Sequence, residues 1–74
     1  MIDATKLHTT PLGEERIRRN LELQGGDILN ICRCWVLDDN AVITRKGKNW
    51  YVEVGHVRLT INANSNTIIT AHKI

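Results

Sequence analysis

The sequence has few of the residues and patterns that identify common functional classes. Its 74 residues include no phenylalanine, one proline, two cysteines and only 4% aromatic side chains. No apolar run approaches the length of a membrane span, and residues 1–4 lack the basic and apolar regions of a secretory signal peptide. We therefore expect a cytoplasmic protein that makes no contact with a membrane.

Motifs that carry chemistry are also missing. The sequence has no phosphate-binding glycine loop, no hydrolase arrangement of Ser or Cys with His, and no cluster of metal ligands. Cys32 and Cys34 lie two positions apart, so on a helix they point in different directions and cannot easily form a disulfide. Two thiolates alone do not make a zinc site. We expect no metal, no small-molecule cofactor, and free thiols in a reducing compartment.

What is present is the composition of an ordinary globular protein. Hydrophobic residues make up 42% of the chain and charged residues 24%. At this length we expect residues 1–74 to form a single compact domain with a small core. The net charge of +2 is too small to require a nucleic-acid partner, so the placement of the charges is more informative.

The clearest structural pattern lies between residues 50 and 62. Apolar residues alternate with polar ones in two runs, as in strands with one buried face: Trp50, Val52 and Val54, then Val57, Leu59 and Ile61. Gly55-His56 fits a two-residue loop with glycine first, which a type II′ turn prefers. The predicted pairs are Val54–Val57, Glu53–Arg58, Val52–Leu59 and Tyr51–Thr60, which match apolar with apolar and acid with base.

Two further strands are predicted to flank this hairpin. Gly47-Lys48 is a second loop with glycine first, and it pairs Arg45 with Trp50, Thr44 with Tyr51, Ile43 with Val52 and Ala41 with Val54. The last strand spans residues 67–73, and the length of the turn before it decides its register. We favour a three-residue loop at residues 63–65, which places Ile69 and Ala71 beside Leu59 and Val57, and Ile68 on the opposite face.

Helices are predicted before the sheet, after an irregular segment at residues 1–9. Thr10-Pro11 is a helix start, with Leu12, Ile17 and Leu21 on the inner side and Gly25-Gly26 at the end. Asp27 caps a second helix, whose apolar stripe is Ile28, Ile31, Cys32 and Trp35, widened by Val36. The sequence therefore predicts an α+β fold: two N-terminal helices packed on one face of a four-stranded antiparallel β-meander, with the other face open.

Alternation places a set of polar side chains on that open face. They are Thr44, Tyr51, Glu53, Arg58, Thr60, Thr70 and His72. The adjoining basic hairpin is either a soluble turn that protects a sheet edge or a clamp for phosphate groups. The candidate residues for binding a nucleic acid or another partner are Arg45, Lys46, Lys48, Tyr51 and Thr60.

One resemblance covers most of the chain. The runs Ile43-Thr44-Arg45-Lys46-Gly47-Lys48-Asn49-Trp50-Tyr51-Val52 and Thr67-Ile68-Ile69-Thr70-Ala71-His72-Lys73, together with His8-Thr9-Thr10 and Glu15-Arg16-Ile17, resemble a family of small bacterial proteins of unknown function. Its members look like genes carried by bacteria and their mobile elements. The resemblance brings no established activity, and it favours toxins and inhibitors of host defence.

A weaker resemblance concerns the fold. Helices followed by an antiparallel sheet, with Thr-Ala-His on the last strand, are similar to the barnase, colicin and RelE-like ribonucleases, which cleave RNA without a metal. Carried over, the catalytic candidates are His72, Arg58 and Thr70, with Lys46 or Lys48 as phosphate contacts.

Two functional hypotheses follow from these residues. The first is a non-catalytic binding protein, such as an anti-CRISPR-like inhibitor, that engages a protein, nucleic acid or nucleoprotein through the open face and basic hairpin. The alternative is a metal-independent ribonuclease toxin.

Overall fold

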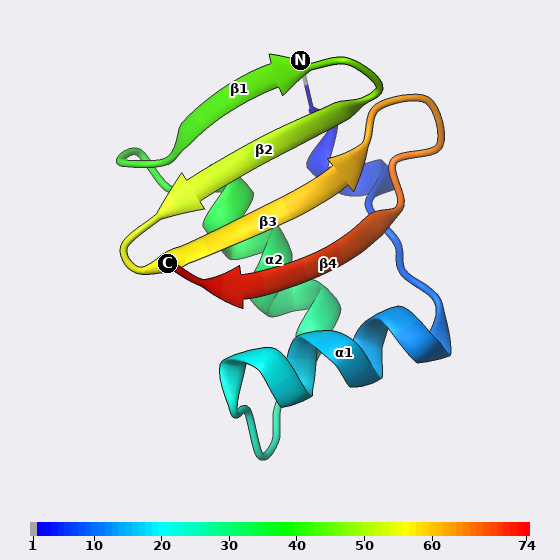
Figure 1. The fold of residues 1–74 in the computed structure, drawn as a ribbon, viewed down its shortest axis with the longest axis vertical. Coiled ribbons are helices and arrows are strands. Elements are labelled where there is room, and N and C mark those ends of the chain that lie inside the picture. The colour runs from blue at the N-terminus through cyan, green and yellow to red at the C-terminus, as the bar shows by residue number, and fades with distance from the viewer. Residues whose placement is uncertain (1) are drawn as a thin grey trace.

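The chain forms two helices and then an antiparallel sheet. The computed structural model describes residues 2–74 and is drawn in Figure 1. In chain order the elements are a 3₁₀ turn, η1 (Ala4–Lys6), then α1 (Pro11–Leu21), α2 (Ile28–Leu37), β1 (Val42–Lys46), β2 (Asn49–Val54), β3 (Val57–Asn62) and β4 (Ile68–Lys73). The strands lie in the order β1-β2-β3-β4, which confirms the predicted four-stranded meander. No helix within residues 2–74 has the length and apolar character needed to cross a membrane.

Both tight hairpins have the predicted register. The pairs Val54–Val57, Glu53–Arg58, Val52–Leu59 and Tyr51–Thr60 join β2 to β3, and Arg45–Trp50, Thr44–Tyr51 and Ile43–Val52 join β1 to β2. Each loop begins with a glycine in the left-handed region, with φ of +61° at Gly47 and +57° at Gly55, as the predicted turns require. The expected pair between Ala41 and Val54 does not form, since β1 begins at Val42, after a turn in which the Ala41 amide donates to the Asp38 carbonyl.

The register predicted for β4 is wrong by two residues. Leu59 pairs with Ala71, Thr60 with Thr70 and Arg58 with His72, and a bulge at Thr60/Ile61 then brings Ile61 opposite Ile68. The loop is longer than three residues, and the Asn62 side chain stabilises it by accepting from the amides of Asn64 and Ser65. The bulge reverses the expected burial, since Ile68 is 1% exposed and Ile69 is 37% exposed.

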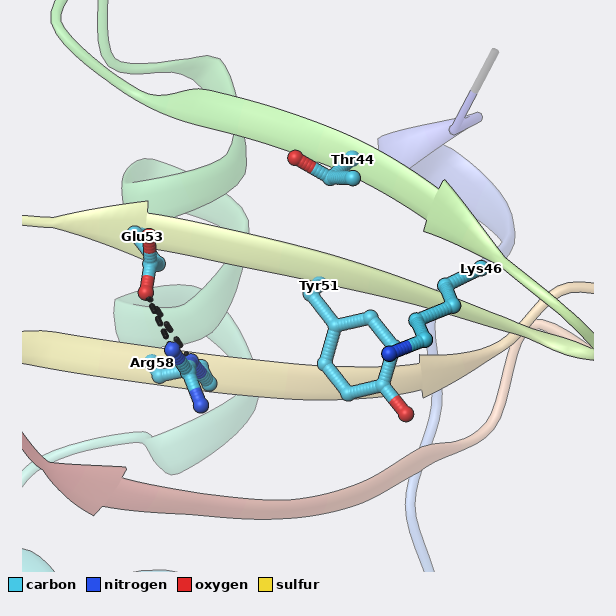
Figure 2. Close-up of a pocket in the computed structure, with 5 residues that line it drawn as sticks. All are labelled: Thr44, Lys46, Tyr51, Glu53 and Arg58. Atoms are coloured by element: carbon cyan, nitrogen blue, oxygen red, sulfur yellow. Dashed lines mark hydrogen bonds and ion pairs between the residues drawn. The ribbon is translucent and has the colours of Figure 1, made fainter.

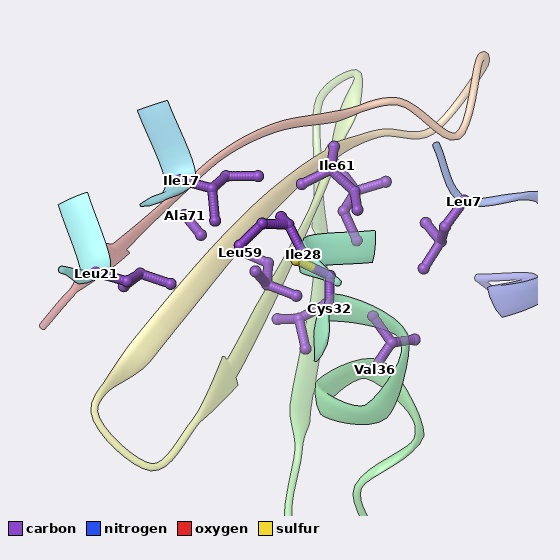
Figure 3. Close-up of a cluster of buried hydrophobic side chains, with 11 residues drawn as sticks. Leu7, Ile17, Leu21, Ile28, Cys32, Val36, Leu59, Ile61 and Ala71 are labelled. Atoms are coloured by element: carbon purple, nitrogen blue, oxygen red, sulfur yellow. The ribbon is translucent and has the colours of Figure 1, made fainter. Parts of the chain in front are cut away.

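The helices cover one face of the sheet. In Figure 1, α1 runs along β4 and α2 passes behind the middle strands. Figure 3 shows side chains of both helices meeting those of the sheet in one cluster. Its buried members are Leu7, Ile17, Leu21, Ile28, Cys32, Val36, Val52, Leu59, Ile61, Ile68 and Ala71. Burial in this cluster raises the pKa of the Cys32 thiol to about 12, because the charged thiolate would lose its hydration.

The first helix differs from the prediction at its C-terminal end and in the residues of its inner face. It starts as expected, with the Thr10 hydroxyl accepting from the Gly13 amide, but it ends at Leu21, because Glu22 takes a left-handed conformation (φ +57°) before Gly25-Gly26 is reached. Leu12 is exposed rather than inward-facing. Gly13 is buried instead, and a Cβ there would overlap the Thr9 hydroxyl, so glycine lets this helix approach the sheet closely.

The inner stripe of α2 is also narrower than expected. Asp27 caps the helix by accepting from the amides of Leu29 and Asn30. Ile28, Cys32 and Val36 are fully buried, whereas Ile31 and Trp35 are half-buried. Cys34 is exposed, and both cysteines are free.

The segment before α1 is more ordered than the sequence suggests. Leu7 is 2% exposed and belongs to the core. His8 forms a parallel bridge with Thr67, and its amide and carbonyl bond to Asn66 and Ile68. The N-terminal segment therefore extends the sheet at the outer side of β4.

The core predicts a clear difference between two helical positions. Ile28→Ala should lower the free energy of unfolding by about 2–5 kcal/mol, because it removes a side chain that is 1% exposed and leaves a cavity. Leu12→Ala is the matched control: Leu12 is 67% exposed, so its loss should change stability by less than about 0.5 kcal/mol. Urea unfolding followed by circular dichroism measures both, and equal stability of the two variants would contradict this core.

Candidate binding site on the open sheet face

The sheet face opposite the helices carries a shallow cavity. It has a volume of about 430 Å³ and is lined by Thr44, Lys46, Tyr51, Glu53 and Arg58. These residues come from β1, β2 and β3, at the strand positions that alternate with the core residues Val52 and Leu59. The cavity therefore lies on the face that the sequence predicted to be open, and its volume is within the range of small-ligand sites.

An ion pair forms one end of the cavity. Arg58 donates from Nε at 3.0 Å and from Nη2 at 2.6 Å to the same oxygen of Glu53, Oε2 (Figure 2). The two residues face each other across the β2–β3 ladder, so the hairpin register holds the pair in place. Within residues 2–74, Arg58 Nη1 and Glu53 Oε1 have no hydrogen-bond partner. This end offers one cationic donor and one acceptor to a ligand.

A lysine and an aromatic ring form the other end. Lys46 is the last residue of β1, and its side chain extends over the part of the face occupied by the Tyr51 ring (Figure 2). Thr44 adds a hydroxyl from the middle of β1. The cavity thus combines two cations, one carboxylate and one aromatic ring, and it can hold a planar group together with an anion.

The cations of the basic hairpin lie on different sides of the sheet. Arg45 lies on the helix side of the sheet, with its guanidinium carbon 5.3 Å from the centre of the Trp50 ring, and its Nε donates to the Gly47 carbonyl at 3.0 Å. Lys46 faces the opposite side, and Lys48 is exposed in the turn. The alternation of side chains along β1 already implies that Arg45 and Lys46 lie on opposite faces, because Arg45 pairs with Trp50, which packs against the core.

The other predicted residues lie beside the cavity without lining it. Thr60 is opposite Tyr51 in one ladder and Thr70 in the next, and His72 is opposite Arg58. The observed register sets His72 directly opposite Arg58, a position that the predicted register gave to Thr70. Asn20 of α1 reaches the neighbouring strand β4, where its side-chain amide donates to the Ala71 carbonyl at 3.1 Å. No three His, Cys, Asp or Glu side chains within residues 2–74 are grouped so that they could hold a metal ion.

Comparison with known proteins assigns this chain to a family. No curated protein and no solved structure matches the chain significantly. The model of a family described as "Protein of unknown function (DUF3781)" matches residues 1–72, which is nearly the whole chain. This match agrees with the resemblance noted in the sequence. The chain therefore belongs to the DUF3781 family, whose function is unknown.

Proposed function

We propose that this protein is a non-catalytic binding protein that takes a single-stranded nucleic acid on its open sheet face. The observation that carries the proposal is the cavity in which Lys46 and Arg58 flank the Tyr51 ring. Proteins that bind single strands combine cations that follow the backbone with aromatic rings on which bases stack.

Each end of the cavity has a role in this proposal. A base stacks on Tyr51, while the Lys46 ammonium and the remaining Arg58 donor, Nη1, contact flanking phosphates. Glu53 fixes the guanidinium and leaves Oε1 free to accept from a base amino group. Thr60, next to Tyr51 in the ladder, extends the polar surface along the strand. Arg45 takes no part, because it lies on the other face.

The biological setting that we propose is inhibition of a nucleoprotein. A chain of 74 residues with a preformed binding face has the dimensions of an anti-CRISPR-like inhibitor carried by a mobile element. Such an inhibitor would engage the exposed strand of a host nucleoprotein complex, and it would need no reaction chemistry of its own.

A ribonuclease is the second candidate, and one observation favours it. The β3–β4 register sets His72 opposite Arg58 and Thr70 opposite Thr60 on the open face, which puts a proton-transfer group beside a cation. Two Arg58 donors are already taken by Glu53, and none of the histidines lines the cavity. These two points favour binding over cleavage.

The binding proposal predicts different effects for two adjacent cations. Lys46→Ala should weaken binding of a fluorescent single-stranded oligonucleotide and reduce the slope of log affinity against log salt by about 0.7, because one phosphate contact is lost. Arg45→Ala removes the same charge from the same hairpin on the opposite face, so it should leave affinity and slope nearly unchanged. Tyr51→Ala should cost about 1–3 kcal/mol of binding free energy through lost stacking.

Fluorescence anisotropy over a salt series measures these three variants against the parent protein. Equal losses for Lys46→Ala and Arg45→Ala would mean that only net charge matters, and they would refute the cavity as the binding site. Absence of binding by the parent at low salt would refute the proposal as a whole.

The ribonuclease candidate has its own test. We expect purified protein to leave total RNA intact with chelator present, from mildly acidic to mildly basic pH. If RNA is cleaved, His72→Ala should reduce the rate by about 10²–10⁴-fold while the far-ultraviolet circular dichroism stays unchanged. Cleavage that depends on His72 would replace binding with catalysis as the function.

A further inference from the structure

One edge of the sheet is covered by other segments of the chain, and the other edge is not. The outer side of β4 is covered: His8 bridges Thr67, the Thr9 hydroxyl donates to the Ile68 carbonyl at 2.9 Å, and Asn20 donates to the Ala71 carbonyl. No segment of residues 2–74 pairs with the outer side of β1, which forms the upper edge of the sheet in Figure 1.

The hairpin geometry shows which groups β1 offers on that edge. In a two-residue hairpin the closing pair exchanges both hydrogen bonds, so Lys46, Thr44 and Val42 direct their amides and carbonyls towards β2. Ile43 and Arg45 direct theirs outward. This edge therefore presents a short row of unpaired donors and acceptors that can bind another strand. It is also apolar at its start, where Val42 is 59% exposed.

The two ends of β1 carry opposite charges. Asp38 and Asp39 lie in the turn before the strand, and Lys46 and Lys48 lie at its end. Asp39 is exposed and makes no hydrogen bond or ion pair within residues 2–74. When such a strand pairs with a copy of itself in antiparallel orientation, the acidic end of each copy meets the basic end of the other.

We propose that two copies of this chain associate through antiparallel pairing of β1 with β1, which joins two sheets into one. A two-fold axis at Ile43 matches both the backbone groups and the charges. Ile43 lies opposite the partner's Ile43, and the two residues exchange hydrogen bonds through their outward amides and carbonyls. Asp39 then lies near the partner's Lys46 and Lys48. Lysine and arginine on an edge usually prevent pairing through mutual repulsion. In this register the cations meet the acidic turn instead.

The dimer would also complete the open-face cavity. In the register centred on Ile43, the partner's Val42 lies opposite Thr44 on the open face. Since Thr44 lines the cavity, the partner adds an apolar wall to each of the two sites and joins them into one surface. The pairing itself does not depend on the proposed nucleic-acid binding and can be tested without a ligand.

Sedimentation velocity at low salt provides the test, and it compares the parent protein with variants whose charges at one end of β1 are reversed. The parent should shift from 8.4 kDa towards twice that mass as its concentration rises to about 1 mM. Asp39→Lys cancels the acidic charge of the turn and sets a cation against the partner's Lys46 and Lys48, and the double variant Lys46→Glu with Lys48→Glu makes both ends acidic. Each variant alone should be monomeric, whereas an equimolar mixture should form heterodimers, because the lysine introduced at position 39 then meets the two introduced glutamates.

Two results would overturn the proposal. One is a parent protein that stays at 8.4 kDa up to about 1 mM, which would leave the edge unpaired or reserved for another protein's strand. The other is a mixture that remains monomeric although thermal melts show both variants folded. All the substituted residues are exposed, so both variants should fold. If either variant fails to fold, the concentration series of the parent protein tests the proposal by itself.

Discussion

The one-sided burial of the sheet is the constraint on which the rest of this structure depends. Val52, Leu59 and Ala71 are fully buried in the middle of the sheet, and Ile17 and Ile28 cover them from the two helices. Because side chains alternate along a strand, this burial forces the residues between them onto the opposite face. The Tyr51 ring and the Glu53–Arg58 pair lie in the open for that reason.

The hairpins could be predicted because several local signals agree there. Alternating apolar residues, a glycine first in each loop, and the opposite charges of Glu53 and Arg58 all specify one register. A slip of one residue would expose Val52 and Leu59 to water, so no competing register is close in energy. The candidate cavity follows directly from this register, and four of its five lining residues were predicted to share the open face.

Other features depend on tertiary contacts that a sequence pattern does not record. The bulge in β4 exchanges the faces of Ile68 and Ile69, and only packing against α1 and the N-terminal segment selects it. Leu7 has no periodic neighbours, so nothing in its surroundings signals that it belongs to the core. Arg45 shows the opposite case, because its pairing with Trp50 already implied that it faces away from Tyr51.

The central claim is that the open face is the binding surface, and nuclear magnetic resonance tests it most directly. The protein is labelled with ¹⁵N and titrated with a short single-stranded oligonucleotide while the amide shifts are followed. The largest shifts should occur at Thr44, Tyr51 and Arg58 around the cavity, while the amides of α1 and α2 change little. Shifts centred on the two helices, or none at saturating oligonucleotide, would contradict this account.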